Sequence, residues 1–173
     1  SMKFISKIVS DVYKDLELNE ETNPFKKLKY QFEPGIRQYL TAEEIVKIRD
    51  LPIPADSPLY NVREIFIFEC YTGLRISDIL TLKWENIAED IITLKMRKTE
   101  RLISLPLQKN VREILERRRK LRNSKEFVFD YLKASRTCED AIENEHRLVS
   151  AIGASTAYIN KRLKIIGKIA NIN

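Results

Sequence analysis

The chain has 173 residues, enough for one domain of ordinary size with a buried core and an appended element. Its 31 lysines and arginines outnumber 25 aspartates and glutamates, and the net charge of +6 favours a polyanionic partner, nucleic acid first and an anionic membrane second. Two cysteines, Cys70 and Cys138, are too few for a disulfide framework and indicate reduced thiols, and no apolar run is long enough to span a bilayer.

The first predicted element is an amphipathic helix over residues 3–18. Its apolar residues recur with helical spacing and form a wide stripe: Phe4, Ile5, Ile8, Val9, Val12 and Leu16. The sequence Asn-Pro-Phe at residues 23–25 ends this helix, and we expect residues 26–38 to form a basic, irregular linker.

Two helices are predicted next, over residues 41–49 and 61–71. The first begins with a capping box, in which Thr41 is the N-cap and Glu44 follows three residues later. Pro52 lies beyond its end and prevents its continuation. The second is apolar nearly all round, which predicts a central, buried helix.

A tight corner follows, in the sequence TGLRISDILTLKW of residues 72–84. Gly73 suits the position just past a helix C-terminus, where a left-handed backbone costs little only for glycine. Arg75 follows at the start of a further helix, predicted over residues 77–84. A guanidinium fixed at such a corner suits a phosphate, although a surface pair with Asp78 is the alternative for an arginine at a helix start.

The only clear β signal covers residues 90–107. Apolar residues alternate on both sides of residues 97–101, which predicts a hairpin with its turn there, and a third strand is possible near Ile87. The predicted fold class is therefore mainly α with a small antiparallel sheet (α+β).

The remaining chain contains two predicted helices. One covers residues 110–122, and its basic run at residues 117–120 is interpreted as a solvated helix end that suits the helix dipole. The segment 127–129 is a short buried piece. Residues 133–153 give no clear signal: residues 137–148 form either a helix or a mobile insert. Ser155 is the expected N-cap of the last helix.

Two stretches of this sequence resemble the tyrosine recombinase (phage integrase) family. The run TGLRISDILTLKWENI is similar to the family's first arginine box, and ITLKMRKTERLISLPL is similar to the β-hairpin that carries a Lys-Thr pair at its turn. The resemblance extends from about Tyr39 to the C-terminus. It implies the first half of a recombinase catalytic domain, preceded in residues 1–30 by the last helix and exit of a core-binding domain, with the catalytic part in residues 31–173.

The resemblance implies roles for individual residues. Arg75 would contact the scissile phosphate, and Lys98 would act as general acid toward the leaving sugar oxygen. Asp78 would orient Arg75 or hold the corner, and Thr99 would support the turn. Two further arginines would contact the DNA backbone: Arg97 and Arg101. This chemistry needs neither metal nor nucleotide cofactor.

The family's remaining site residues have no counterpart here. The sole histidine, His146, lies in His-Arg-Leu-Val rather than in a His-x-x-Arg box, and we interpret it as an exposed residue ahead of the last helix. No tyrosine follows such a box, and Tyr158 is interpreted as packing. The chain is thus expected to be a fragment without a nucleophile and without activity of its own. Apolar faces at residues 4–12 and 159–170 are then expected to be exposed or covered by a neighbouring chain.

Two hypotheses remain open from the sequence. The first is a fragment of a bacterial or phage-derived recombinase that cuts and rejoins DNA. Its partners would be double-stranded DNA and other recombinase protomers, and it would act in the cytoplasm, at the nucleoid. The second is a non-catalytic, basic helical DNA-binding module on the same scaffold.

Overall fold

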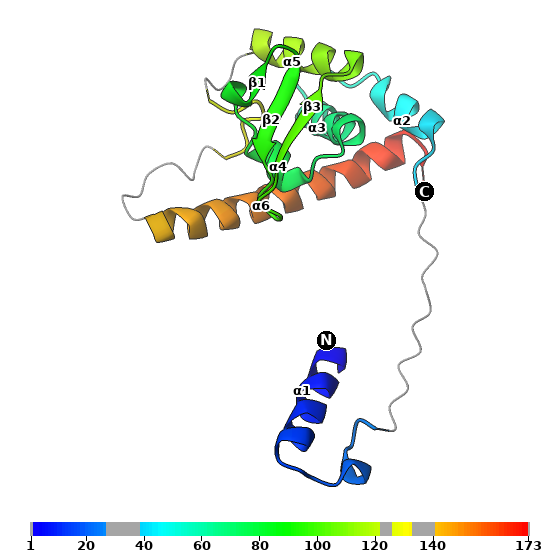
Figure 1. Ribbon diagram of the computed structural model, residues 1–173. Helices are drawn as coiled ribbons and strands as arrows, with labels where there is room; N and C mark the ends of the chain where they lie inside the picture. The colour runs from blue at the N-terminus through cyan, green and yellow to red at the C-terminus, as the bar shows by residue number, and fades with distance from the viewer. Residues whose placement is uncertain (1, 27–38, 122–125, 133–140, 173) are drawn as a thin grey trace. The chain divides into compact units, whose positions relative to one another are not determined.

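The structure is a computed structural model that describes residues 2–26, 39–121, 126–132 and 141–172 (Figure 1). The chain divides into two compact units, Ser1–Tyr39 and Leu40–Asn173. The predicted linker, apart from Lys26, and the domain boundary expected near residue 30 lie outside the described residues. The described part is mostly helical with one three-stranded antiparallel sheet, so the predicted fold class is confirmed.

The first unit contains helix α1 (Met2–Asp15) and a 3-10 turn, η1 (Glu20–Thr22). The turn folds back onto the helix, because the Tyr13 hydroxyl donates to the carbonyl of Thr22 at 3.2 Å. The apolar stripe is largely exposed, as expected. Its exposed members are Phe4, Ile5, Ile8, Val12 and Leu16.

The second unit begins with α2 (Ala42–Arg49), and its predicted capping box is present. The backbone N–H of Glu44 donates to the Thr41 hydroxyl at 3.2 Å, and the Glu44 carboxylate accepts from the backbone N–H of Thr41 at 2.7 Å. Two N–H groups of the first turn that lack helical partners are thereby satisfied.

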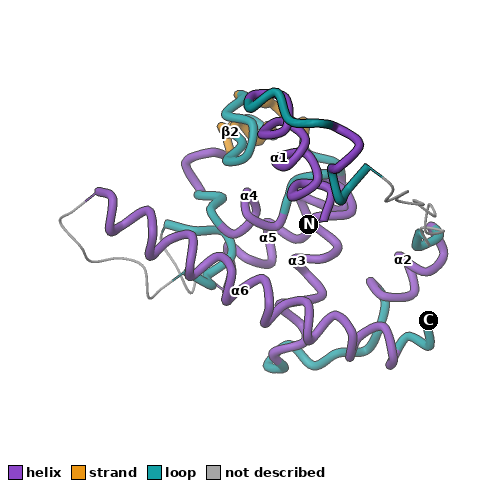
Figure 2. Tube along the Cα trace, turned by 90° about the horizontal axis from the view of Figure 1, so that it is seen from below, coloured by secondary structure: helices purple, strands orange, loops and turns teal. Residues whose placement is uncertain are grey.

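Helix α3 (Pro58–Thr72) is the centre of the second unit. It starts earlier than predicted, because the Ser57 hydroxyl caps it and Pro58 occupies its first turn. It contacts α2, α5 and α6, and Figures 1 and 2 both show α3 and α6 side by side. Its buried apolar residues are Val62, Ile65, Ile67 and Phe68.

Helix α4 (Ile76–Leu80) is shorter than predicted. The prediction extended it to Trp84, but the backbone of the following residues pairs elsewhere. The N–H of Val128 donates to the carbonyl of Leu82 at 2.9 Å, and the N–H of Trp84 donates to that of Glu126 at 3.0 Å. Trp84 instead begins a 3-10 turn, η2 (Trp84–Asn86).

The sheet has the order β1-β2-β3, with β1 (Ile87–Ala88), β2 (Ile91–Lys95) and β3 (Leu102–Pro106). The hairpin and the third strand are therefore confirmed. The register pairs Thr93 with Ser104, and the predicted alternation holds, since Ile92 and Leu94 are buried.

In helix α5 (Lys109–Leu121), the interpretation of the basic run as a solvated helix end holds for Arg119 and Lys120, which are exposed, but is wrong for Arg118. Arg118 is 7% exposed, donates to Asn61 Oδ1 at 2.5 Å and to the Val128 carbonyl at 3.3 Å, and lies over the Phe129 ring. Burial lowers the pKa of this guanidinium. Arg117 binds the buried Glu64 through two contacts of 3.2 Å. Helical periodicity assigns charged residues to the exposed face, whereas Arg117 and Arg118 fasten α5 to α3.

The last helix, α6 (Ala141–Ile169), is longer than predicted. Ser155 lies inside it rather than at its N-cap, and its hydroxyl donates to the carbonyl of Tyr131 at 3.3 Å. The apolar face at residues 159–170 was expected to be exposed or covered by another chain, but Ile159 and Ile166 are buried within this chain. The apolar residues that this part of α6 exposes are instead Tyr158, Ile165 and Ile169. None of the helices within the described ranges is both long and apolar enough to cross a bilayer.

Candidate active site and nucleic-acid interface

The corner between α3 and α4 is built as the sequence predicts. Gly73 has φ 66° and ψ 10°, the left-handed conformation of a helix C-cap, and its N–H donates to the carbonyl of Glu69 at 2.8 Å. The Thr72 hydroxyl donates to the Phe68 carbonyl at 2.7 Å and accepts from the N–H of Leu74 at 3.4 Å. The chain direction at the corner is therefore fixed by local hydrogen bonds.

Arg75 is the N-cap residue of α4, and its carbonyl accepts from the N–H groups of Asp78 and Ile79 at 2.9 and 3.0 Å. Its side chain is exposed. Within the described residues no hydrogen bond or ion pair holds this guanidinium. The backbone is rigid here and the charge is available to a ligand.

Asp78 is fully buried, one turn after Arg75. Its Oδ1 accepts a hydrogen bond from the backbone N–H of Arg97 at 2.9 Å, whereas Oδ2 has no hydrogen-bond partner among the described residues. The Asp78 carboxylate thereby fastens the hairpin turn to α4. The elements that carry Arg75 and Lys98 therefore meet at this carboxylate.

The hairpin turn runs from Met96 to Arg101 and is closed by two backbone hydrogen bonds. The N–H of Met96 donates to the carbonyl of Arg101 at 2.9 Å, and the N–H of Glu100 donates to that of Met96 at 2.8 Å. Glu100 has φ 55°, a left-handed conformation. Thr99 donates its hydroxyl to the sulfur of Met96 at 3.8 Å, and Lys98 is exposed at the tip.

The turn concentrates positive charge in a short segment. Its cationic residues, with the last residue of β2, are Lys95, Arg97, Lys98 and Arg101. Arg97 is the least exposed, and its Nη2 lies 2.5 Å from Oε1 of Glu145 on α6. Lys95 pairs loosely with Glu100 at 3.6 Å. The exposed cations of this turn suit the phosphates of a nucleic acid.

Glu145 is the residue of this site that the sequence did not reveal. It lies 48 residues after Arg97, in a segment without a clear secondary-structure signal. No local pattern marks a carboxylate that will meet an arginine so far along the chain. His146, beside it, is exposed as predicted but lies within α6.

Tyr131 is half-buried, whereas Tyr158 on α6 is 38% exposed. Tyr131 and Tyr158 form an edge-to-face pair with ring centroids 6.0 Å apart, and Arg162 lies 3.3 Å from the centroid of the Tyr158 ring. Burial, together with the nearby Tyr158, raises the pKa of Tyr131 to about 12. A hydroxyl with so high a pKa is a weak nucleophile at neutral pH.

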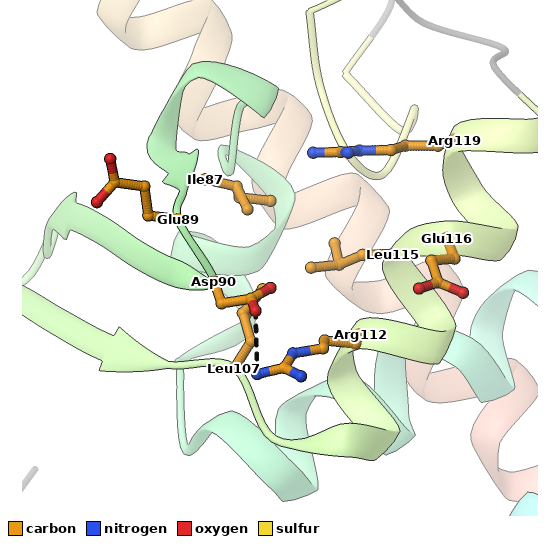
Figure 3. Close-up of a pocket in the computed structure, with 8 residues that line it drawn as sticks. All are labelled: Ile87, Glu89, Asp90, Leu107, Arg112, Leu115, Glu116 and Arg119. Carbon is orange, nitrogen blue, oxygen red and sulfur yellow. Dashed lines mark ion pairs between the residues drawn. The ribbon is translucent and has the colours of Figure 1, made fainter.

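A cavity of 480 Å³ lies between the β1–β2 turn and α5 (Figure 3). Apolar side chains of Ile87 and Leu115 line it, and Arg112 crosses it to pair with Asp90 at 3.1 Å. It contains neither Arg75 nor Lys98. Across the described segments, no group of three or more His, Cys, Asp or Glu is arranged to hold a metal ion.

Comparison with solved structures identifies the fold. A lambda integrase tetramer bound to a Holliday junction matches with a TM-score of 0.58 and 20% identity, over 87% of this chain and 43% of that one. A lambda integrase dimer bound to a COC′ core site matches with a TM-score of 0.57 and 21% identity, over 89% and 45%. The chain thus spans less than half the length of either solved chain. No curated protein sequence gives a significant match.

The sequence itself identifies the family. The sequence profile of the phage integrase family matches residues 38–159, which include the Gly73 corner, the hairpin and most of α6. The same residues form the part of the second unit in which Arg75, Asp78 and Lys98 lie. The chain therefore belongs to the phage integrase family.

Proposed function

We propose that this chain is part of a site-specific DNA recombinase that cuts and rejoins DNA through a phosphotyrosyl intermediate. Family membership and the lambda integrase-like fold support the recombinase class. The observation that carries the site is the hydrogen bond from the Arg97 N–H to Asp78, because it joins the arginine corner to the lysine turn.

Arg75 is proposed to bind the scissile phosphate. Its guanidinium is exposed and unpaired in the described part of the chain, on a backbone fixed by the Gly73 corner. A guanidinium that contacts the phosphate stabilises negative charge that develops on the non-bridging oxygens. Arginine also keeps its charge at any working pH.

Lys98 is proposed to be the general acid. When the phosphorus–oxygen bond to the leaving sugar breaks, the departing oxygen needs a proton, and an ammonium at an exposed turn can deliver it. Thr99 and Asp78 support the turn, while Arg97 and Arg101 bind the DNA backbone.

A substrate with sulfur at the leaving position tests this role of Lys98. In a whole recombinase that includes these residues, Lys98→Ala should slow cleavage by about a hundredfold or more. A sulfur leaving group needs little protonation, so it should restore most of the lost rate. A Lys98→Ala enzyme that is equally slow on both substrates would show that Lys98 only binds phosphate.

The chain alone is proposed to lack strand-cleaving activity; the raised pKa of Tyr131 and the packing of Tyr158 against it support this. Incubation with duplex DNA and a denaturing gel should reveal no covalent protein–DNA adduct. An adduct would contradict this proposal, because it would require a tyrosine of this chain to attack phosphorus. Binding to DNA should be weak, insensitive to sequence and steeply salt-dependent.

A second candidate is a non-catalytic DNA-binding module. The cationic turn favours it, because exposed cations bind phosphates whether or not chemistry follows. The two functions are distinguished in the whole protein: a covalent phosphotyrosyl adduct on a suicide substrate supports the recombinase, and its absence supports the module.

Contact with other protomers is also proposed. The exposed apolar residues of α1 and of α6, Ile165 and Ile169 among them, are suited to pack against another chain. Analytical ultracentrifugation of the purified chain should detect concentration-dependent self-association, and a monomer at every concentration would contradict it.

A further inference from the structure

We propose that the carboxylate of Glu145 occupies, in the DNA-free protein, the place that a DNA backbone phosphate takes on Arg97. This inference rests on the proposed function, and it assigns to α6 a part in controlling the DNA-binding turn. It makes Glu145 a residue that the DNA must displace.

The backbone of Arg97 stays in place whichever partner its side chain has. Its N–H is held by the fully buried carboxylate of Asp78 at 2.9 Å. Only the side chain of Arg97 is free to exchange partners, and that side chain is 28% exposed. The guanidinium of Arg97 can therefore reach a phosphate that binds the neighbouring Lys98.

The Arg97–Glu145 pair has the features of an exchangeable contact. It is a single contact, from Nη2 to Oε1, and the Glu145 side chain is 59% exposed. Exposed pairs of this kind contribute little to stability. Arg117 and Glu64 show the opposite arrangement, with two contacts of 3.2 Å to a carboxylate whose side chain is only 5% exposed.

Phosphate is a suitable competitor for the carboxylate. Both groups present oxygen acceptors to the planar fork of a guanidinium, and a phosphate can accept two parallel bonds from it. Binding of DNA at the turn therefore exchanges the internal anion for an external one. Removing the charge of Glu145 should free Arg97 in advance and strengthen DNA binding.

A double-mutant cycle tests the exchange. Fluorescence anisotropy of a labelled duplex at low salt measures the affinity of the wild type, Glu145→Gln, Arg97→Gln and the double variant. Glu145→Gln should bind DNA about threefold to tenfold more tightly. In the Arg97→Gln background the same change should give little gain, because the arginine that it releases is absent.

Glu143→Gln is the matched control. Glu143 lies on the same helix and pairs with Arg147 at 2.8 Å, with side chains 50% and 49% exposed. The substitution removes the same charge, so it measures the general effect of a less acidic α6. We expect it to change the affinity by less than about twofold.

The outcomes separate this inference from the proposed function. Equal gains from Glu145→Gln and Glu143→Gln, or a gain that persists without Arg97, overturn the inference and leave the proposed function standing. If no variant binds DNA even at low salt, the inference is overturned, because no phosphate then replaces the carboxylate, while the adduct test in the whole protein still decides the proposed function. A gain confined to Glu145→Gln and dependent on Arg97 supports the exchange.

Discussion

Asp78 and Arg97 are joined by a hydrogen bond across 19 residues of sequence: the backbone N–H of Arg97 donates to Asp78 Oδ1 at 2.9 Å. The carboxylate is fully buried, so the bond forms where water does not compete for it. It fixes the position of the hairpin turn relative to α4. The turn therefore presents Lys98 from a defined place rather than from a free loop.

Replacing Asp78 should loosen this turn. Asp78→Ala leaves the Arg97 N–H without its acceptor, and the free energy of unfolding should fall by about 1–3 kcal/mol. Asp78→Asn keeps an acceptor oxygen and removes a buried charge, so its effect should be smaller. Urea denaturation measures the stability, and amide hydrogen exchange of Arg97 should be faster in the alanine variant alone.

Asp56→Ala is the control, because Asp56 is exposed. It should leave both the urea midpoint and the exchange of Arg97 unchanged. If Asp78→Ala unfolds at the wild-type urea concentration and keeps a protected Arg97 amide, the carboxylate does not hold the turn.

Gly73 should be required because its backbone is left-handed, and not because a side chain would clash there. A Cβ added there would meet no atom within 4 Å, yet φ is 66°. Gly73→Ala should therefore cost about 1–2 kcal/mol through left-handed strain alone. Gly153 also has open space around a new Cβ but lies within α6, so Gly153→Ala should instead stabilise the protein by about 0.5–1 kcal/mol. Thermal unfolding would refute this account if the two substitutions shifted the midpoint in the same direction.

Arg118 should be a stabilising residue of the second unit. Arg118→Ala removes its hydrogen bonds to Asn61 and to the Val128 carbonyl, and the free energy of unfolding should fall by about 2–3 kcal/mol. Arg119, the next residue, lies 5.4 Å from the centroid of the Trp84 ring, and Arg119→Ala should cost only about 0.5–1 kcal/mol. Equal losses in urea denaturation would mean that Arg118 is no more than a surface charge.

Features set by neighbouring residues could be predicted from the sequence. The Thr41 capping box and the Gly73 corner depend on hydrogen bonds within a few residues, so their local patterns sufficed. The sheet followed from alternating apolar residues. The length of α6 could not be predicted, because Gly153 and Ser155 are weak helix formers and contacts such as the Ser155 bond to Tyr131 lie outside any local window.

The site was predicted only in part for the same reason. The sequence indicated Arg75 and Lys98 by their motifs, but the contact that joins their elements connects residues 19 positions apart. The partner of Arg97 lies 48 positions away. Exposure was also misjudged at Arg118, which belongs to a run interpreted as solvated and is buried. Charge patterns do not show which side chains pack against a second element.

The most direct test of the account compares two double variants by anisotropy with a labelled DNA duplex across a salt series. Arg75→Ala with Lys98→Ala removes two charges from the proposed site, while Lys109→Ala with Lys120→Ala removes two exposed charges from α5. The site variant should lose about tenfold or more in affinity, and its log–log salt slope should become shallower by about 2. The α5 variant should keep the wild-type affinity and slope; equal losses in both variants would contradict a DNA site at the corner and the turn.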